Sequence, residues 1–277
     1  DVNVAGKSRP DRCSLGPIAA LDLVLHCLSS SMKGTTLQQI FAITPAVSSR
    51  YMQFSLRILR ELLRQMPDGR IEWPSSENVF EDFTSMINMR HPLLDKGFCF
   101  VDGLNIPVAE SQDGDIQNAY YNGWTCAHYC SSVLAFAPDG TLIFCALNAP
   151  GNWHDGIIAD DLYLRLIDDT PTGFYAIVDT AFPRNHPRRQ GRIVVPLKKG
   201  SKRPRQQRRV GVFDRLLEEN SQLVSARQAA EWGMRSLQGS FGRLKMPLPA
   251  DDSEYRLLLL ETCVRLHQFR TRVVGIN

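Results

Sequence analysis

The sequence contains no long hydrophobic run. None of its apolar stretches reaches eighteen residues, which is about the length that a transmembrane helix needs. The N-terminus also lacks the charged segment, apolar core and small-residue cleavage site of a secretory signal. We therefore expect no membrane partner and no Sec-type export.

A disulfide framework is also missing. The seven cysteines are an odd number and are scattered through segments that resemble core, which favours reduced thiols in a cytosolic or nuclear protein. The 277 residues are 43% hydrophobic and 22% charged, so we expect a folded chain with one large or two medium domains.

Acidic residues are absent from one segment. Residues 184–209 hold eleven Lys or Arg and no Asp or Glu, while the rest of the chain has 21 basic and 29 acidic residues. This concentration favours a polyanionic partner or a nuclear import signal, and the alternative is a solvated surface loop. Within it, Lys198, Lys199, Lys202 and Arg203 fit an import signal and a DNA-contacting loop equally well. We expect the protein in the nucleus.

The N-terminal part predicts helices. Apolar spacing predicts one helix over residues 17–30, and Thr36 with Gln39 forms a capping-box pattern that opens a second. Thr44 caps a third, whose expected inward face is Val47, Tyr51, Phe54, Ile58 and Leu62. The last two outline a helix-turn-helix, although any small helical bundle gives this pattern. The second helix of the pair begins with three groups able to contact DNA, namely Ser48, Ser49 and Arg50.

Two predicted strands each end in an aspartate. Asp102 follows 98–101 and Asp179 follows 175–178, with a predicted hairpin (124–137 and 142–147) between them. If the two strands are neighbours, their carboxylates meet at one edge of the sheet and need a cation between them. Glu231, on a helix expected over 223–237, completes an all-oxygen site for Mg²⁺ or Mn²⁺. The plainer alternative is that both aspartates cap loops.

Four stretches, in order along the chain, together resemble the DDE-type transposases of the PIF/Harbinger group. They are residues 101–103, residues 137–140 with 150–155, residues 177–183, and residues 225–233 followed by Leu237, Phe241 and Leu244. The resemblance implies an α/β, ribonuclease H-like mixed sheet flanked by helices over residues 96–277, with the basic loop 184–209. It is preceded by an all-α helix-turn-helix region over residues 1–95.

The resemblance also implies a function. Asp102, Asp179 and Glu231 would form a catalytic triad that binds two divalent ions, Mg²⁺ or Mn²⁺. The enzyme would cut the terminal inverted repeats of a transposon and join them to target DNA. An accessory DNA-binding protein and a homo-oligomer are possible partners. The alternative is a domesticated, transposase-derived DNA-binding protein without catalysis. A third hypothesis is a ribonuclease H-like nuclease that is unrelated to transposition.

Other polar groups leave alternatives open. Arg227 and Arg235 stand one turn on either side of Glu231, where they either meet DNA phosphates or form surface ion pairs. Asp155, beside His154, suits the first turn of a helix and is a minor metal candidate. Cys126, His128 and Cys130 alternate as on a strand, a weak pattern for zinc because a fourth ligand is not evident.

Overall fold

The computed structural model describes residues 15–183, 187–197 and 210–275. It begins with helices and a short 3₁₀ turn at Pro67–Gly69, in the order α1 (Pro17–Ser29), α2 (Gly34–Ile40), α3 (Pro45–Gln65) and α4 (Glu77–Asn88). In these ranges no helix combines the length and the apolar composition that a membrane crossing requires.

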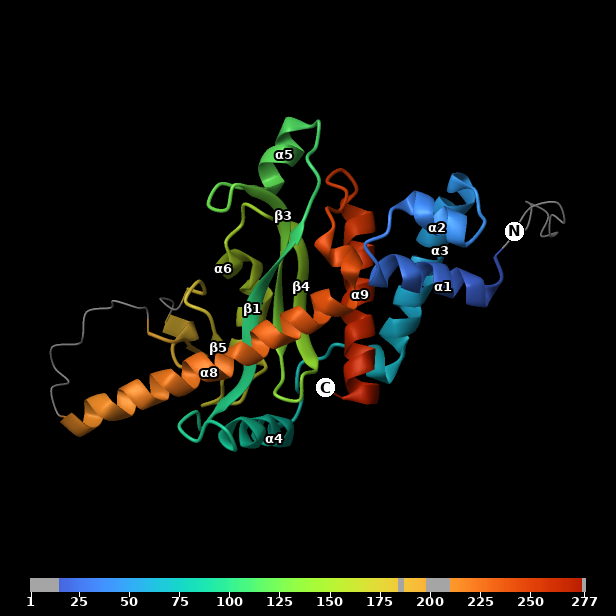
Figure 1. Cartoon of the computed structure of the whole chain (residues 1–277). Coiled ribbons are helices and arrows are strands. Elements are labelled where there is room, and N and C mark those ends of the chain that lie inside the picture. The colour runs from blue at the N-terminus through green and yellow to red at the C-terminus, as the bar shows by residue number, and fades with distance from the viewer. Residues whose placement is uncertain (1–14, 184–186, 198–209, 276–277) are drawn as a thin grey trace.

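A mixed sheet follows the helices (Figure 1). Its strands are β1 (Gly97–Pro107), β2 (Tyr121–Asn122), β3 (Ala127–Phe136), β4 (Leu142–Pro150), β5 (Tyr175–Val178) and β6 (Ile193–Val194). β3 lies antiparallel between β1 and β4, whereas β5 pairs with β1, and β6 with β5, in parallel. The resulting order β4-β3-β1-β5-β6, with β2 on one end of β3, confirms the predicted ribonuclease H-like arrangement.

Helices connect and flank the strands. The short helices are α5 (Gly114–Tyr120), α6 (Asp155–Ile158) and α7 (Asp160–Asp168), with 3₁₀ turns at Pro187–Arg189 and Gly242–Lys245. Two long helices, α8 (Val210–Ser240) and α9 (Ser253–Val274), end the described chain. One buried cluster joins the sheet to α8, α9 and the N-terminal helices, and the other joins it to α4, α6 and α7. Helices therefore flank the sheet, as predicted.

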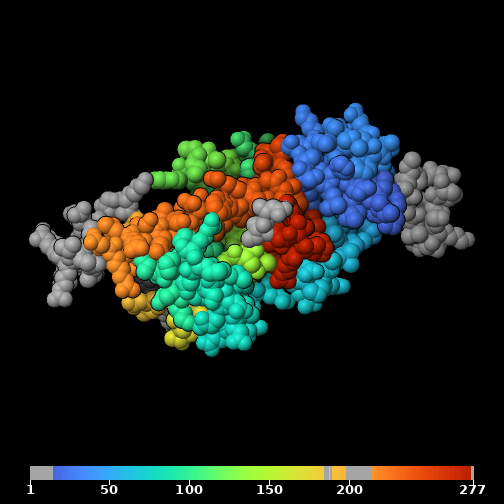
Figure 2. All heavy atoms as spheres, turned by 60° about the horizontal axis from the view of Figure 1, so that its bottom comes forward, coloured from blue at the N-terminus to red at the C-terminus, as the bar shows by residue number. Residues whose placement is uncertain are grey.

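The N-terminal helices share a core with α9. Leu23 of α1 and Leu56 of α3 belong to the same buried cluster as Leu259 of α9. Glu261 of α9 accepts two hydrogen bonds from Arg64 of α3, both 2.7 Å long. Burial alone would raise the pKa of Glu261, but the hydrogen bonds from Arg64 and Arg265 bring it below its ordinary value. Figure 2 shows the blue N-terminal helices lying directly against the red α9.

Helix α3 is rotated relative to the prediction. On α3 the buried residues are Ser48, Met52, Leu56 and Leu63. The expected inward residues Phe54, Ile58 and Leu62 are instead 60%, 45% and 51% exposed. The prediction was wrong because α3 carries two apolar rows, and the row that contains Leu56 and Leu63 is the one packed in the shared core.

Helix boundaries differ at two other places. The Thr36–Gln39 capping box is not formed, because α2 begins one turn earlier with Lys33 as its N-cap. Thr44 does cap α3, accepting a hydrogen bond from the Val47 N–H at 3.4 Å. The pattern predicts one helix near 211–220 and another over 223–237, whereas the structure has a single helix, α8, across both ranges. Asn220 and Ser221, between the two expected ranges, lie within it.

Glycine allows α8 to approach the sheet closely. A Cβ atom on Gly233 would lie 2.7 Å from the ring of Phe136 on β3, so a larger residue would push the helix away. Leu237 and Ala230, one turn to either side, are fully buried. This contact fixes the face of α8 that carries Arg227 and Glu231.

A buried histidine on α9 predicts sensitivity to acid. Burial first, and then Arg270, lower the pKa of His267 to about 4. In the unfolded chain the pKa of a histidine is about 6.5, so acid protonates the unfolded state before the folded state. The free energy of unfolding is therefore unaffected by His267 above pH 6.5 and decreases as the pH falls from 6.5 towards 4. We expect His267 to account for a loss of about 3 kcal/mol in unfolding free energy between pH 7 and 4.

Urea unfolding of the wild type and of His267→Gln at a series of pH values measures this loss. The variant cannot gain a charge, so its stability should fall less steeply in acid. Identical pH profiles would show that His267 is not buried in its neutral form.

Candidate active site

Asp102 and Asp179 lie side by side because of the strand register. Val101 of β1 pairs with Val178 of β5 in parallel, and each aspartate is the next residue. Asp102 was predicted to follow the end of its strand, and this is wrong. Strand β1 continues to Pro107 through its pairing with β3. Only the pairing with β5 ends at Val101. The two carboxylates are therefore neighbours, as expected, because the pairing of β1 with β5 ends just before them and not because both strands end there.

Glu231 reaches the same place from α8, and Arg227 joins all three carboxylates. Arg227 Nη2 donates to Glu231 Oε1 at 2.9 Å. Its Nη1 is 3.6 Å from Asp179 Oδ1 and 3.8 Å from Asp102 Oδ2. The three acidic residues singled out from the sequence thus surround one guanidinium. The structure brings together residues from β1, β5 and α8.

A neighbouring backbone amide donates a hydrogen bond to each of the two aspartates. The Gly103 N–H donates to Asp102 Oδ1 at 2.9 Å, and the Thr180 N–H donates to Asp179 Oδ1 at 2.6 Å. Burial is the main cause that raises the pKa of Asp102 to about 6. The Gly103 amide and Arg227 lower this pKa, whereas the charges of Asp179 and Glu231 raise it further. The site therefore carries more negative charge than Arg227 neutralises.

Asp155 is a fourth carboxylate in this cluster. It is the first residue of α6, as the helix-start interpretation predicted. A Cβ atom on Gly103 would lie 2.9 Å from Asp155 Oδ1, so the missing side chain of Gly103 leaves the space that this carboxylate fills. Burial and the charge of Asp179 raise the pKa of Asp155. Sequence reasoning gave it only a minor role, because nothing in the local pattern showed that α6 meets β1.

The donor chemistry fits hard divalent cations. Four carboxylates and one guanidinium leave a net charge of about −3 if all are ionised, and oxygen donors of this kind suit Mg²⁺ or Mn²⁺. Across residues 15–183, 187–197 and 210–275, however, no three His, Cys, Asp or Glu side chains are close enough together to hold one ion. In the structure these carboxylates surround the Arg227 guanidinium, which occupies the space between them.

A family model matches the part of the chain that contains this site. Residues 101–268 match the family described as DDE superfamily endonuclease, which is more than half of the chain. The chain belongs to this family. No curated protein and no solved structure matches the chain significantly. Membership in the DDE superfamily endonucleases indicates nuclease chemistry on DNA, for which such enzymes typically use divalent metal ions.

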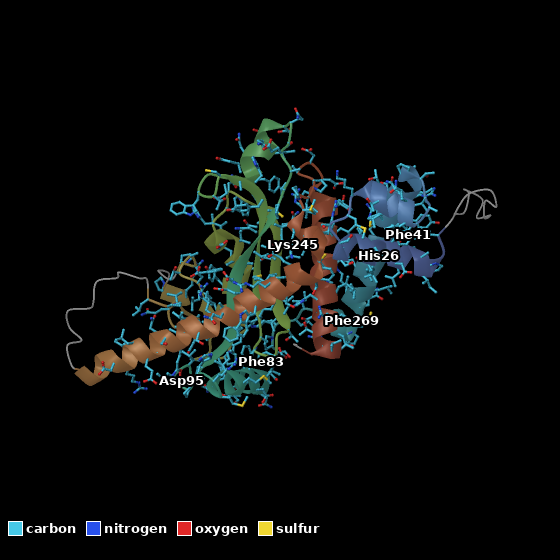
Figure 3. The ribbon with its side chains drawn as sticks, viewed as in Figure 1. His26, Phe41, Phe83, Asp95, Lys245 and Phe269 are labelled. Atoms are coloured by element: carbon cyan, nitrogen blue, oxygen red, sulfur yellow. The ribbon has the colours of Figure 1, made fainter. Side chains whose placement is uncertain are left out.

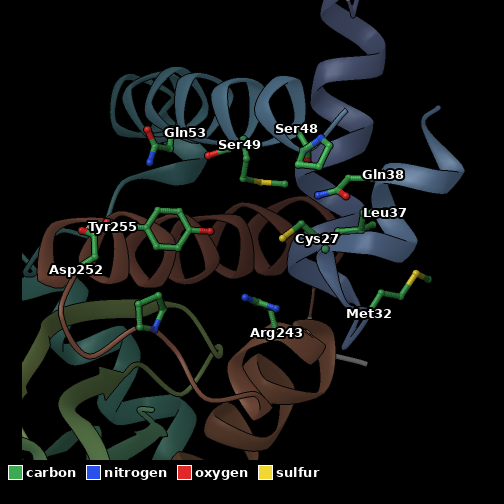
Figure 4. A pocket seen from close by; sticks show the side chains of 14 residues that line it. Cys27, Met32, Leu37, Gln38, Ser48, Ser49, Gln53, Arg243, Asp252 and Tyr255 are labelled. Atoms are coloured by element: carbon green, nitrogen blue, oxygen red, sulfur yellow. Dashed lines mark hydrogen bonds between the residues drawn. The ribbon is translucent and has the colours of Figure 1, made fainter. Parts of the chain in front are cut away.

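The two helices from which a helix-turn-helix was predicted correspond to α2 and α3. His26 of α1 packs edge-on against Phe41 in the turn, with ring centroids 5.8 Å apart (Figure 3). Ser49 and Arg50 are exposed at the start of α3, whereas Ser48 is 8% exposed and faces the interior. Ser49 and Gln53 line a cavity of about 350 Å³ between α3 and the start of α9 (Figure 4).

Two further groups of residues were singled out from the sequence, the basic residues and the zinc candidates. Arg235 is exposed on α8, while Lys198, Lys199, Lys202 and Arg203 lie outside the described residues. The zinc alternative gains no support. Cys126 precedes β3 and is exposed, and Cys130 is buried, which raises the pKa of its thiol to about 11.

Proposed function

We propose that this chain is a PIF/Harbinger-type DDE transposase that cuts transposon ends and joins them to target DNA. The observation that carries the proposal is the convergence of Asp102, Asp179 and Glu231 from three separate elements on one point, inside a matched endonuclease domain. Surface carboxylates have no structural need to gather in this way, since they repel one another.

In the proposed enzyme these three residues hold two Mg²⁺ or Mn²⁺ ions, with Asp155 beside them. When bound, such ions activate the attacking oxygen and stabilise the leaving oxygen of a phosphodiester. The amides of Gly103 and Thr180 donate to Asp102 and Asp179 and so restrict the rotation of the two carboxylates. The close packing of Gly233 on Phe136 keeps Glu231 within reach of the two strands.

The DNA contacts are also part of the proposal. Ser49 and Arg50 of α3 contact one region of double-stranded DNA, with buried Ser48 supporting the helix rather than touching the duplex. Lys198, Lys199, Lys202 and Arg203 bind phosphates or serve nuclear import, and Arg227 and Arg235 add positive charge along α8. A homo-oligomer and an accessory DNA-binding protein complete the proposed assembly in the nucleus.

A domesticated DNA-binding protein without catalysis is the second candidate. It is favoured by one observation, the ion pairs that Arg227 makes with all three carboxylates. In that protein Arg227 would be a permanent structural counter-ion. The two candidates differ in whether divalent ions produce cleavage.

A cleavage assay with labelled terminal-repeat DNA tests the proposed function. Mg²⁺ and Mn²⁺ should support cutting, whereas Ca²⁺, which is larger and less strict in its geometry, should allow binding with little turnover. EDTA should stop cutting. Cutting that continues in EDTA would contradict a metal-dependent site. A protein that binds the correct ends with Mg²⁺ and leaves them intact would support the non-catalytic candidate.

A further inference from the structure

Arg227 is placed to act as a removable cation. Its guanidinium makes one 2.9 Å hydrogen bond to Glu231 and lies 3.6 and 3.8 Å from the two aspartates. Its side chain is 24% exposed, so it is in contact with solvent while it neutralises the cluster. A metal ion that uses the same three residues needs the space between them.

The surrounding structure restricts how this space can be cleared. α8 cannot slide away from or towards the sheet freely, because Gly233 is in direct contact with Phe136 and Ala230 and Leu237 are buried. The two aspartates are fixed on their strands and accept hydrogen bonds from the neighbouring amides. The long, partly exposed side chain of Arg227 is the component that can move by rotation about its own bonds.

Charge makes the two occupants mutually exclusive. One guanidinium and a divalent ion within about 4 Å of each other repel strongly where water is partly excluded. The same carboxylates cannot remain in contact with Arg227 and close around an ion. Without either cation, the half-buried Asp102 carboxylate would face those of Asp179 and Glu231 with no positive charge between them.

On these grounds, and resting on the proposed function for the identity of the ion, we infer that Arg227 is an exchangeable counter-ion. It neutralises Asp102, Asp179 and Glu231 in the metal-free protein and leaves them when a divalent cation binds. Arg227 is thus a positioning residue that keeps the site assembled before the metal arrives and lowers the apparent affinity for the metal.

Metal binding in the absence of DNA tests this inference. Mn²⁺ is titrated into the whole protein, and free Mn²⁺ is followed by electron paramagnetic resonance. Arg227→Gln should bind Mn²⁺ at least about tenfold more tightly than the wild type, because no internal cation competes. Arg227→Lys keeps the charge and should stay within about threefold of the wild type. Arg215→Gln removes an exposed charge elsewhere on α8 and should leave the affinity unchanged.

Thermal unfolding supplies an independent measurement. Metal-free Arg227→Gln should melt at a lower temperature than the wild type, and Mn²⁺ should raise its melting temperature by more. Equal or weaker Mn²⁺ binding by Arg227→Gln, in a variant whose circular dichroism shows it folded, would overturn the inference. If Arg227→Gln does not fold, the affinity of Arg227→Lys relative to Arg215→Gln is decisive, and a tenfold gain in the lysine variant would contradict a competing charge.

The inference and the proposed function can fail separately. Exchange is measured without DNA, so the expected affinities together with absent DNA cleavage would preserve the counter-ion role and reject the transposase. Cleavage that depends on Mg²⁺, together with an unchanged Mn²⁺ affinity of Arg227→Gln, would support the transposase and reject the counter-ion role.

Discussion

Asp102→Asn, Asp179→Asn and Glu231→Gln should each reduce DNA cleavage by at least about a hundredfold. Each change keeps the approximate shape of the side chain and removes one negative charge, so metal ions bind more weakly and the reacting groups are misplaced. Asp168→Asn, at an exposed position at the end of α7, is the matched control and should cut normally. Cleavage is measured with labelled terminal-repeat DNA and Mg²⁺.

The stability of the same variants separates a catalytic loss from unfolding. The pKa of Asp102 is raised to about 6, so above that pH its ionised form reduces the stability of the folded state relative to the unfolded chain. Metal-free Asp102→Asn should therefore be as stable as the wild type or more stable at pH 7.5. DNA binding through the N-terminal helices should persist in all three variants.

Two outcomes would revise the site. A triad variant that cuts at the wild-type rate would remove that residue from the metal-binding set. Asp155→Asn addresses the fourth carboxylate, which touches Gly103 beside Asp102. A loss of cleavage comparable to that of Asp102→Asn would add Asp155 to the set, and a small loss would leave it as the first residue of α6.

Arg256→Met should cause the largest loss of stability, roughly 3–5 kcal/mol in unfolding free energy. Arg256 is fully buried in the first turn of α9. It donates to Asn148 Oδ1 at 2.5 Å, to the Pro249 carbonyl at 2.5 Å, to the Ala250 carbonyl at 2.9 Å and to the Tyr120 hydroxyl. Methionine fills much of the volume but leaves these partly or fully buried acceptors without the arginine donor.

Urea unfolding measures this loss, and Arg270→Met, at an exposed position on the same helix, is the control. Arg256→Lys should recover only part of the stability, since one ammonium cannot reproduce the planar fork that reaches four acceptors. Arg256→Met with wild-type stability would show that water satisfies the acceptors and that the arginine is dispensable.

The sequence predicted the centre of the site because its determinants are local. Short apolar strands that end their parallel pairing at the same level bring the residues that follow them together, so Asp102 and Asp179 could be placed as neighbours from pattern alone. The ribonuclease H-like fold was predicted from the resemblance, and the order of its strands comes from the structure. Glu231 was located by the resemblance, since a glutamate on a helix has no distinctive pattern of its own.

The faces of the N-terminal helices were not predictable in the same way. α3 has two apolar rows, and only its contact with α9, some two hundred residues later, decides that Leu56 is buried and Phe54 exposed. The central position of Arg227 was missed because helical spacing shows its partner Glu231 but not the two strands opposite. Long-range packing, rather than local propensity, determined each of these features.

The shared core of α3 and α9 has a consequence for where DNA would be cut. Leu56 and Leu259 lie in one buried cluster, and Arg64 and Glu261 bind across the same two helices. A DNA duplex bound by α3 would therefore reach the carboxylate cluster at a fixed distance and a fixed angle. In the proposed transposase, base pairs can be inserted between the sequence bound by α3 and the cleavage point. The cut should then stay at the same distance from the bound sequence and fall at a different base, because the protein fixes the distance there and does not recognise the bases.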